Sequence, residues 1–245
     1  MTQTITAIVC AYNEAPLLPA CLHSLLAQTR PPNQLIVINN ASSDQTGAVA
    51  RAVPGVLVVD EPVKGLVVAR EKARRVATGD ILAYVDADCR APLQWLEAIE
   101  CRFDSGPGLV AVTGPYRFYD WDWLGRTLIS LYDVLVAPPT HVLVHYLFGA
   151  GAVLYGGNFA VRREALARIG GFDRTIEFHG EDTNLGRRLT PCGRIAVAGD
   201  CWVWTSARRY QAMGKRQVFS LYVRNFWSEI LHHRPADREH LDVRA

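Results

Sequence analysis

The chain has 245 residues, about half of them apolar and a fifth charged, and its formal net charge is +2. This length suits one large α/β domain or two small ones, and it buries enough surface to fold without disulfides. A net charge this small predicts that nucleic acid is not a partner. The six cysteines show no C-x-x-C spacing, which predicts free thiols in a reducing compartment rather than a zinc site.

The first half of the chain alternates short apolar runs with amphipathic stretches. The runs at residues 5–10, 35–38, 56–59, 81–85 and 109–113 predict buried strands. The stretches between them carry leucine, isoleucine or valine at helical spacing, which predicts helices. Apolar strands separated by helices indicate an α/β fold with a mostly parallel sheet that helices cover on both faces.

The second half, residues 116–245, breaks this rhythm. Residues 127–155 are strongly apolar, but an aspartate, two prolines and two histidines interrupt them, so we expect no membrane-spanning helix. A short helix is expected near residues 163–169, with glycines before and after it. The N-terminus shows no signal-peptide pattern, which favours a cytoplasmic protein. No clean linker is visible, so we expect one domain over residues 1–245.

Residues at the ends of the predicted strands are the first candidates for a site. In open parallel sheets, ligands bind at the carboxyl ends of the strands, and these ends lie along one edge. The segments that follow the first, second and fourth strands are Ala11-Tyr12-Asn13-Glu14, Asn39-Asn40-Ala41-Ser42-Ser43-Asp44 and Asp86-Ala87-Asp88.

Asp86 and Asp88 are the sharpest signal among them. Two carboxylates with one spacer leave a buried strand together, and paired hard oxygens suit Mg²⁺ or Mn²⁺, which also hold substrate phosphates. The alternative is a solvated acidic turn, because the D-x-D pattern is common.

Two further charged groups are candidates. Lys64 precedes a helix on which Arg70 and Arg74 share one face. This face suits binding of phosphate or of a carboxylate of the metal site, and the alternative is an ordinary solvated surface. Glu181 and Asp182 begin a later helix. Acidic residues there favour the helix dipole, and one of them could also serve as a general base.

Together these segments resemble family 2 glycosyltransferases of the GT-A fold, over roughly residues 5–209. The segments occur in the order typical of that family: AYNE at 11–14, IVINNASSDQT at 36–46, KG at 64–65 with AR at 69–70, GD at 79–80 before VDAD at 85–88, GN at 157–158 with VRR at 161–163, GGFD at 170–173 and ED at 181–182. Each segment is weak alone, and the ordered set is strong.

The resemblance implies a fold, a reaction and a donor. It implies a GT-A-like sheet in which residues 1–115 bind a nucleotide-diphosphate sugar, with a UDP-sugar favoured, and residues 116–245 bind the acceptor and carry the base. The reaction would be an inverting transfer to a hydroxyl of a saccharide or a lipid-linked acceptor, in cell-envelope, polysaccharide or glycolipid synthesis. A divalent cation would stabilise the charge on the departing diphosphate.

The resemblance also implies roles for individual residues. Ala11, Tyr12 and Glu14 would line the nucleotide pocket, Asn39 would contact the base, and Gly157 and Asn158 would border the acceptor. Asp88 would bind the metal directly, and Asp86 would contact the ribose or the metal shell. Asp182 would be the catalytic base with Glu181 beside it. Four further binding candidates rest on the residues themselves. They are Lys64 and Arg70, and Arg208 and Arg209, which could close over the diphosphate or belong to a plain basic tail.

The sequence departs from the family pattern at two points and leaves rivals open. Asn39 and Asn40 stand where aspartate is usual, and the Q-x-x-R-W motif of processive synthases is absent. The rivals are a nucleotidyltransferase and a nucleotide-sugar-binding protein without turnover. The density of leucine and valine over residues 124–155, with the basic tail, also raises the hypothesis of peripheral contact with the inner face of a membrane.

Overall fold

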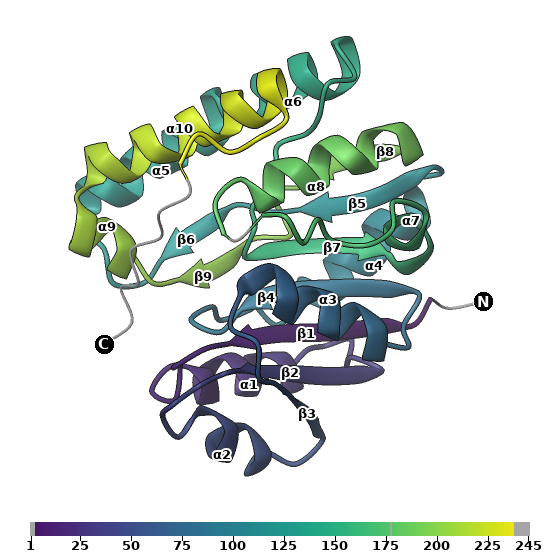
Figure 1. Ribbon diagram of the computed structural model, residues 1–245, viewed down its shortest axis with the longest axis vertical. Helices are drawn as coiled ribbons and strands as arrows, with labels where there is room; N and C mark the ends of the chain where they lie inside the picture. The colour runs from purple at the N-terminus through teal and green to yellow at the C-terminus, as the bar shows by residue number, and fades with distance from the viewer. Residues whose placement is uncertain (1–2, 177, 238–245) are drawn as a thin grey trace.

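The structure is a computed structural model that describes residues 3–176 and 178–237. Its centre is a seven-stranded sheet in the order β3-β2-β1-β4-β7-β5-β8, in which β7 alone runs antiparallel to its neighbours (Figure 1). The strands are β1 (Ile5–Ala11), β2 (Gln34–Asn40), β3 (Val56–Glu61), β4 (Ile81–Asp86), β5 (Leu109–Thr113), β7 (Asn158–Arg162) and β8 (Arg194–Val197).

Helices cover both faces of this sheet, as the apolar strands require. One face packs against α1 (Leu18–Leu26), α2 (Thr46–Arg51) and α4 (Trp95–Ser105). The other packs against α3 (Leu66–Val76), α7 (Arg163–Arg168) and α8 (Glu181–Leu189). Alternate residues of each central strand point to opposite faces, so each strand contributes to both apolar cores.

The five strands predicted from the sequence are confirmed, and β7 and β8 were missed. Residues 156–157 were expected to be a turn, and they are followed directly by β7. This strand inserts antiparallel between β4 and β5, so its partners lie far away in the sequence. Short strands of this kind owe their pairing to tertiary contacts, which local periodicity does not reveal.

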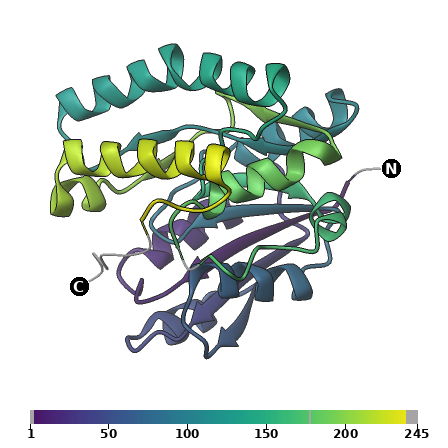
Figure 2. The ribbon, with the colours of Figure 1, turned by 45° about the horizontal axis from the view of Figure 1, so that its top comes forward.

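A second layer stands over one end of the sheet. It contains a two-stranded sheet of β6 (Tyr116–Phe118) and β9 (Val203–Thr205). Its helices are α5 (Trp123–Leu135), α6 (Ala137–His141), α9 (Arg208–Met213), α10 (Lys215–His232) and a π-helical turn, η1 (Val142–Leu147). Figure 2 shows α5 and α10 beside each other along the outside of the molecule.

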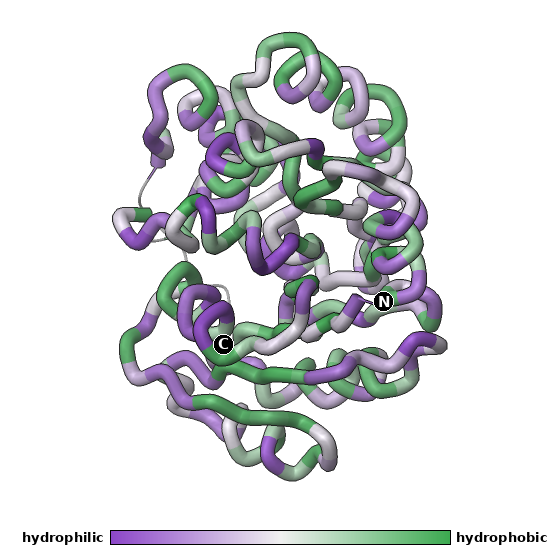
Figure 3. Tube along the Cα trace, turned by 90° about the vertical axis from the view of Figure 1, so that its right-hand side faces the viewer, coloured by the Kyte–Doolittle hydropathy of each residue, from purple (hydrophilic) through white to green (hydrophobic). Residues whose placement is uncertain are grey.

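The apolar region of the second half forms a nearly continuous helical arm. Pro138 and Pro139 lie in the first turn of α6, where a missing backbone N–H costs little, so they bend the arm without ending it. Within the described residues, Trp123–Leu147 is long and apolar enough to cross a membrane by length and composition, and 17% of its most apolar window is buried. The interruptions that spoke against such a helix in the sequence therefore leave it intact, and Figure 3 shows apolar residues on the outer helices as well as in the sheet.

Two buried histidines fasten this arm to the edge of the main sheet. His141 Nε2 lies 2.9 Å from the Ile195 carbonyl oxygen, and the Ile195 N–H donates to His145 Nε2 at 3.0 Å. Burial lowers the pKa of both imidazoles, which keeps them neutral. They satisfy backbone groups that edge strand β8 would otherwise leave unpaired.

Asn158 is a buried junction between the sheet and the second layer. Its amide nitrogen donates to the Gly114 and Cys201 carbonyls at 2.9 and 2.8 Å, and its carbonyl oxygen accepts from Trp95 Nε1 at 3.0 Å. Its exposed fraction is 1%. The position of β7 relative to α4 and to the loops after β5 and before β9 thus depends on this side chain.

We predict that Asn158→Ala lowers the free energy of unfolding by about 2–4 kcal/mol, because it leaves several buried polar groups unpaired. Urea unfolding measures this change. Asn39→Ala is the matched control, since that side chain makes a single exposed hydrogen bond to Asp60, and we expect it to cost less than about 1 kcal/mol. Equal costs for the two variants would contradict this role for Asn158.

Candidate active site

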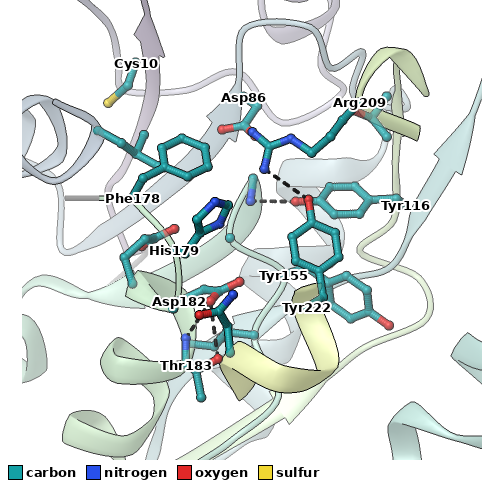
Figure 4. Close-up of a pocket in the computed structure, with 18 of the residues that line it drawn as sticks. Cys10, Asp86, Tyr116, Tyr155, Phe178, His179, Asp182, Thr183, Arg209 and Tyr222 are labelled. Carbon is teal, nitrogen blue, oxygen red and sulfur yellow. Dashed lines mark hydrogen bonds between the residues drawn. The ribbon is translucent and has the colours of Figure 1, made fainter. Parts of the chain in front are cut away.

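A cleft of about 1320 Å³ opens where the carboxyl ends of β1, β2 and β4 face the second layer. Figure 4 shows side chains from both parts of the chain facing this space, among them Asp86, Asp182, Arg209 and Tyr222. The cleft thus lies at the edge that the sequence predicted, and it brings together residues separated by more than a hundred positions.

Arg70 is the buried cation at the base of the cleft. It lies on α3 with an exposed fraction of 2%, and its Nη2 donates to the Gly156 carbonyl at 2.5 Å. The same guanidinium forms an ion pair with Glu181 and lies 3.9 Å from Asp86 Oδ1. Arg70 therefore joins α3 to helix α8 through carboxylates, which is the second of the two binding alternatives that the sequence left open for it.

Glu181 and Asp182 begin α8, directly after Gly180 in a left-handed conformation. Burial raises the pKa of Glu181 to about 7, against the lowering effect of Arg70. Burial also raises the pKa of Asp182, whose Oδ1 accepts from the Thr183 N–H at 2.7 Å. The two neighbouring carboxylates differ in geometry, since Glu181 is held against Arg70 and Asp182 lies beside Thr183 in the cleft.

Gly156 and Gly157 let the chain pass between the carboxylates. A Cβ atom on Gly157 would lie 2.1 Å from Asp86 Oδ2, and one on Gly156 would lie 2.8 Å from Glu181 Oε1. The Gly157 N–H donates to the Tyr116 hydroxyl at 2.6 Å, which fixes this loop to β6. A side chain at either position would displace these carboxylates, which accounts for the glycine pair before β7.

Arg208 is a second cation, and it contacts the acids on the other side of the cleft. It forms two hydrogen bonds to the Glu14 carboxylate, one of them at 3.0 Å. Its Nη2 also lies 3.0 Å from Asp88 Oδ2. The Asp88 side chain is 11% exposed and the Asp86 side chain 47%. Asp86 is therefore open to the cleft, and Asp88 lies beneath a guanidinium from α9.

The two aspartates provide a partial metal site. Within residues 3–176 and 178–237, no group of three or more His, Cys, Asp and Glu side chains is arranged to hold a metal. Mg²⁺ and Mn²⁺ commonly take one or two carboxylates and complete their shell with substrate phosphates and water. The donor set of Asp86 and Asp88 fits such a shared ion, which would displace or share the charge of Arg208.

The remaining walls are aromatic and cationic. Lys64 Nζ lies 4.0 Å from the centre of the Tyr12 ring, and both residues line the cleft on the side of β1 and α3. On the other side, Arg209 Nη1 donates to the Tyr222 hydroxyl at 3.3 Å. The Arg209 guanidinium lies over the Phe178 ring. Flat rings beside cations suit a base, a ribose or a phosphate.

Most of the candidates from the sequence line this cleft. They are Ala11, Tyr12, Glu14, Lys64, Arg70, Asp86, Asp88, Gly157, Glu181, Asp182, Arg208 and Arg209.

Two candidates do not line the cleft, and the structure corrects them. The Asn39 amide donates to Asp60 on β3 at 2.8 Å, away from the cleft, and its neighbour Asn40 lines the wall instead. The Asn158 amide is fully used inside the protein, so it does not border an acceptor.

The sequence analysis missed several aromatic residues of the site. Tyr116, Tyr155 and Tyr222 line the cleft together with His179. Tyr116 belongs to an aromatic stretch visible in the sequence, but its contact with the Gly157 loop depends on β6. The Tyr155 hydroxyl donates to Asp133 on α5 at 2.5 Å, a pairing across 22 residues that no local pattern indicates.

Comparisons with known proteins agree with this geometry. The sequence profile described as "Glycosyl transferase family 2" matches residues 6–170. Glycosyltransferase AglE of Haloferax volcanii is 27% identical over 228 residues, which cover 89% of this chain and 72% of AglE.

Solved structures share the fold. The mannosyltransferase PcManGT of Pyrobaculum calidifontis, in complex with GDP-Man and Mn²⁺, has a TM-score of 0.69 at 22% identity and covers 95% of this chain. The chain spans 64% of that protein's length. A second structure is glucosyl-3-phosphoglycerate synthase of Mycobacterium tuberculosis in complex with Mn²⁺, UDP and phosphoglyceric acid. It has a TM-score of 0.64 at 21% identity, and the match covers 94% of this chain and 78% of the synthase chain.

We predict that Asp133→Asn raises the melting temperature at pH 8 and has little effect near pH 4. Burial raises the pKa of Asp133 from 3.8 to about 6. The native state therefore binds this proton more tightly than the unfolded state, and the wild type loses stability as the pH rises from about 4 to above 6. The uncharged asparagine escapes that loss and still accepts from Tyr155.

Asp80→Asn is the control of opposite sign. Hydrogen bonds from Thr4 lower the pKa of Asp80, so its contribution to stability is present at neutral pH and is lost as the pH falls. The control variant should melt below the wild type at pH 8. Melting curves of the wild type, Asp133→Asn and Asp80→Asn from pH 4 to 8 test both predictions. If the two variants changed the melting temperature at pH 8 in the same direction, the burial of Asp133 would be contradicted.

Proposed function

Because the chain belongs to glycosyl transferase family 2 and has the GT-A fold, we propose that it transfers a sugar from a nucleotide-diphosphate sugar to an acceptor hydroxyl with inversion. The observation that carries this proposal is the convergence of two pairs of carboxylates, Asp86 with Asp88 and Glu181 with Asp182, in one cleft. One pair suits the departing diphosphate, and the other suits the incoming nucleophile.

The donor is placed on the side formed by β1, β2 and β4. The Tyr12 ring and Lys64 offer a surface for the nucleoside, and Arg208 and Arg209 supply positive charge toward the phosphates. A Mg²⁺ or Mn²⁺ ion at Asp86 and Asp88 would neutralise charge on the diphosphate as it leaves. Two neighbouring structures were solved with Mn²⁺, one with GDP-Man and one with UDP, which supports a donor of this class, and a UDP-sugar remains our favoured donor.

Asp182 acts as the general base. The acceptor oxygen attacks the anomeric carbon, the bond from that carbon to the phosphate oxygen breaks, and the acceptor proton passes to the Asp182 carboxylate. The products are the glycoside and the nucleoside diphosphate. The raised pKa of Asp182 makes it a stronger base than an ordinary aspartate.

Glu181 positions this base. Its ion pair with Arg70 holds the first turn of α8 against the Gly156 carbonyl, so the neighbouring Asp182 carboxylate is aimed into the cleft. Held against Arg70, the Glu181 side chain supports the first turn of α8 rather than meeting the acceptor. The two adjacent carboxylates therefore have separate tasks.

We predict that Asp182→Asn lowers turnover by about 10²–10⁴-fold, the usual contribution of a general base, and leaves donor affinity unchanged. Asparagine still accepts from the Thr183 N–H and removes the buried charge, so the melting temperature at neutral pH should equal or exceed that of the wild type. Glycosyl transfer assays and donor titration measure the two effects. Turnover near the wild-type value in Asp182→Asn would rule out this base.

Glu181→Gln is the matched control for the neighbouring carboxylate. Because this variant removes the carboxylate that fixes the Arg70 guanidinium and the first turn of α8, it should lower turnover although Asp182 is still present. A Glu181→Gln variant with wild-type turnover would show that the pair with Arg70 does not position Asp182.

Asp88→Ala should weaken donor binding in the presence of Mn²⁺ and leave binding in its absence little changed. The physical reason is that the variant removes one carboxylate ligand of the ion that bridges protein and diphosphate. Calorimetric titration of the donor with and without Mn²⁺ measures the difference. Equal loss under both conditions would assign Asp88 a role independent of metal.

A further inference from the structure

The cleft continues beyond the carboxylates into a groove between α5 and α10. Apolar and aromatic side chains of both helices line it: Ile129, Tyr132, Val136, Phe219, Val223 and Trp227. The Tyr132 and Phe219 rings, which meet edge to face with centroids 6.1 Å apart, form an aromatic contact between the two helices. Because this groove and Asp182 belong to one cleft, an elongated molecule in the groove would have one end beside the proposed base.

The outer face beside this groove is apolar and open to water. Along α5 and η1, the large exposed side chains include Leu128, Leu131, Leu135, Leu147 and Phe148. Leu135 and Leu147 are 63% and 69% exposed. Apolar side chains gathered in this way mark a surface that meets another apolar phase, since isolated exposed leucines are common but a continuous face is not.

The acids of these two helices point inward. Asp133 accepts from the Tyr155 hydroxyl. Glu229 is fully buried, where Arg187 pairs with it at 3.1 Å and Asn184 donates to it at 3.0 Å. These bonds attach α10 to α8, the helix that carries Asp182, so the groove is fixed relative to the proposed base.

The exposed charges of the same helices are positive. Arg126 on α5 and Arg216 and Arg224 on α10 are exposed, and Arg224 pairs with Asp237 at 2.8 Å. Among the described residues, Arg126 and Arg216 make no ion pair. An apolar face flanked by arginines, with its acids turned inward, is complementary to the surface of a bilayer that contains anionic lipids.

We propose that the groove between α5 and α10 binds the hydrocarbon chain of a membrane lipid that carries the acceptor hydroxyl, with the outer face of α5 and η1 lying in the bilayer surface. This inference rests on the proposed function and names the acceptor class for the same cleft. The polar head of the lipid reaches Asp182, and its chain passes between the helices toward the membrane. The apolar face and the groove then serve a single substrate.

Flotation with vesicles tests the docking face. The full chain is mixed with vesicles of phosphatidylcholine and phosphatidylglycerol in a 7:3 ratio, and separately with phosphatidylcholine alone. We expect the wild type to float with the anionic vesicles, and Leu135→Glu and Leu147→Glu each to lower the bound fraction at least tenfold. Leu57→Glu is the matched control, since Leu57 is 45% exposed on β3 at the opposite end of the molecule (Figure 1), and it should float like the wild type.

Two results would overturn the docking face. One is a wild-type protein that stays in the soluble fraction with both vesicle types. The other is a dimer, seen by light scattering, that Leu135→Glu dissociates while flotation is unchanged, because the face would then belong to a second copy of the chain.

A fluorescent C18 chain, cis-parinaric acid, tests the groove. We expect saturable binding to the wild type, at least tenfold weaker binding to Val223→Trp, which fills the groove, and unchanged binding to Leu231→Trp on the exposed side of α10. Equal affinity for all three proteins would contradict the groove as the chain site.

Donor binding separates failure of this inference from failure of the proposed function. A nucleotide-sugar that stabilises the wild type and Leu135→Glu alike, together with absent vesicle and chain binding, would overturn the lipid acceptor and leave the transferase intact. A wild type that binds vesicles and cis-parinaric acid but no nucleotide-sugar would contradict the proposed function, and with it the acceptor role of the lipid.

Discussion

The buried contact of Arg70 with Glu181 and Gly156 is the constraint on which the cleft depends. A guanidinium at this depth is tolerated only with partners, and removal of one partner costs about 3–5 kcal/mol. Arg70 comes from α3 on the nucleotide side, and its partners come from α8 and the loop before β7. One side chain therefore fixes the distance between the two pairs of carboxylates. The glycines at 156 and 157 allow this approach, because any larger side chain would strike Glu181 or Asp86.

Charge balance explains why so many acids can share the cleft. Arg70 pairs with Glu181, and Arg208 lies between Glu14 and Asp88, so two guanidinium groups are shared among three acids. Asp86 and Asp182 are less committed, and they are the acids that face the open space. In the proposed function, a divalent ion at Asp86 and Asp88 would supply positive charge to these two acids, and Arg208 would then be free to turn toward the phosphates.

The sequence predicted the parts of the site that follow buried strands, and it was less informative about the rest. Asp86 and Asp88 were found because β4 is a clear apolar run, and parallel strands place their ends together. Asn39 was misplaced because a strand pattern does not say which of two consecutive asparagines faces the cleft. Asn158 seemed to be a ligand because only the fold reveals that Trp95, Gly114 and Cys201 surround it. Tyr116 and Tyr155 were missed because their positions depend on the second layer, whose short strands and helical arm are set by tertiary contacts.

The most direct test of the central claim is a thermal-shift titration of UDP- and GDP-sugars with and without Mn²⁺, on the wild type and on Asp88→Asn. A ligand that binds only the native state raises the melting temperature by mass action. The account predicts that the melting temperature of the wild type rises only when Mn²⁺ and sugars of one nucleotide class are both present. It also predicts that Asp88→Asn shows no such rise. A rise that is equal without Mn²⁺, or no rise with any nucleotide-sugar, would contradict the view that the cleft holds a metal-bound donor.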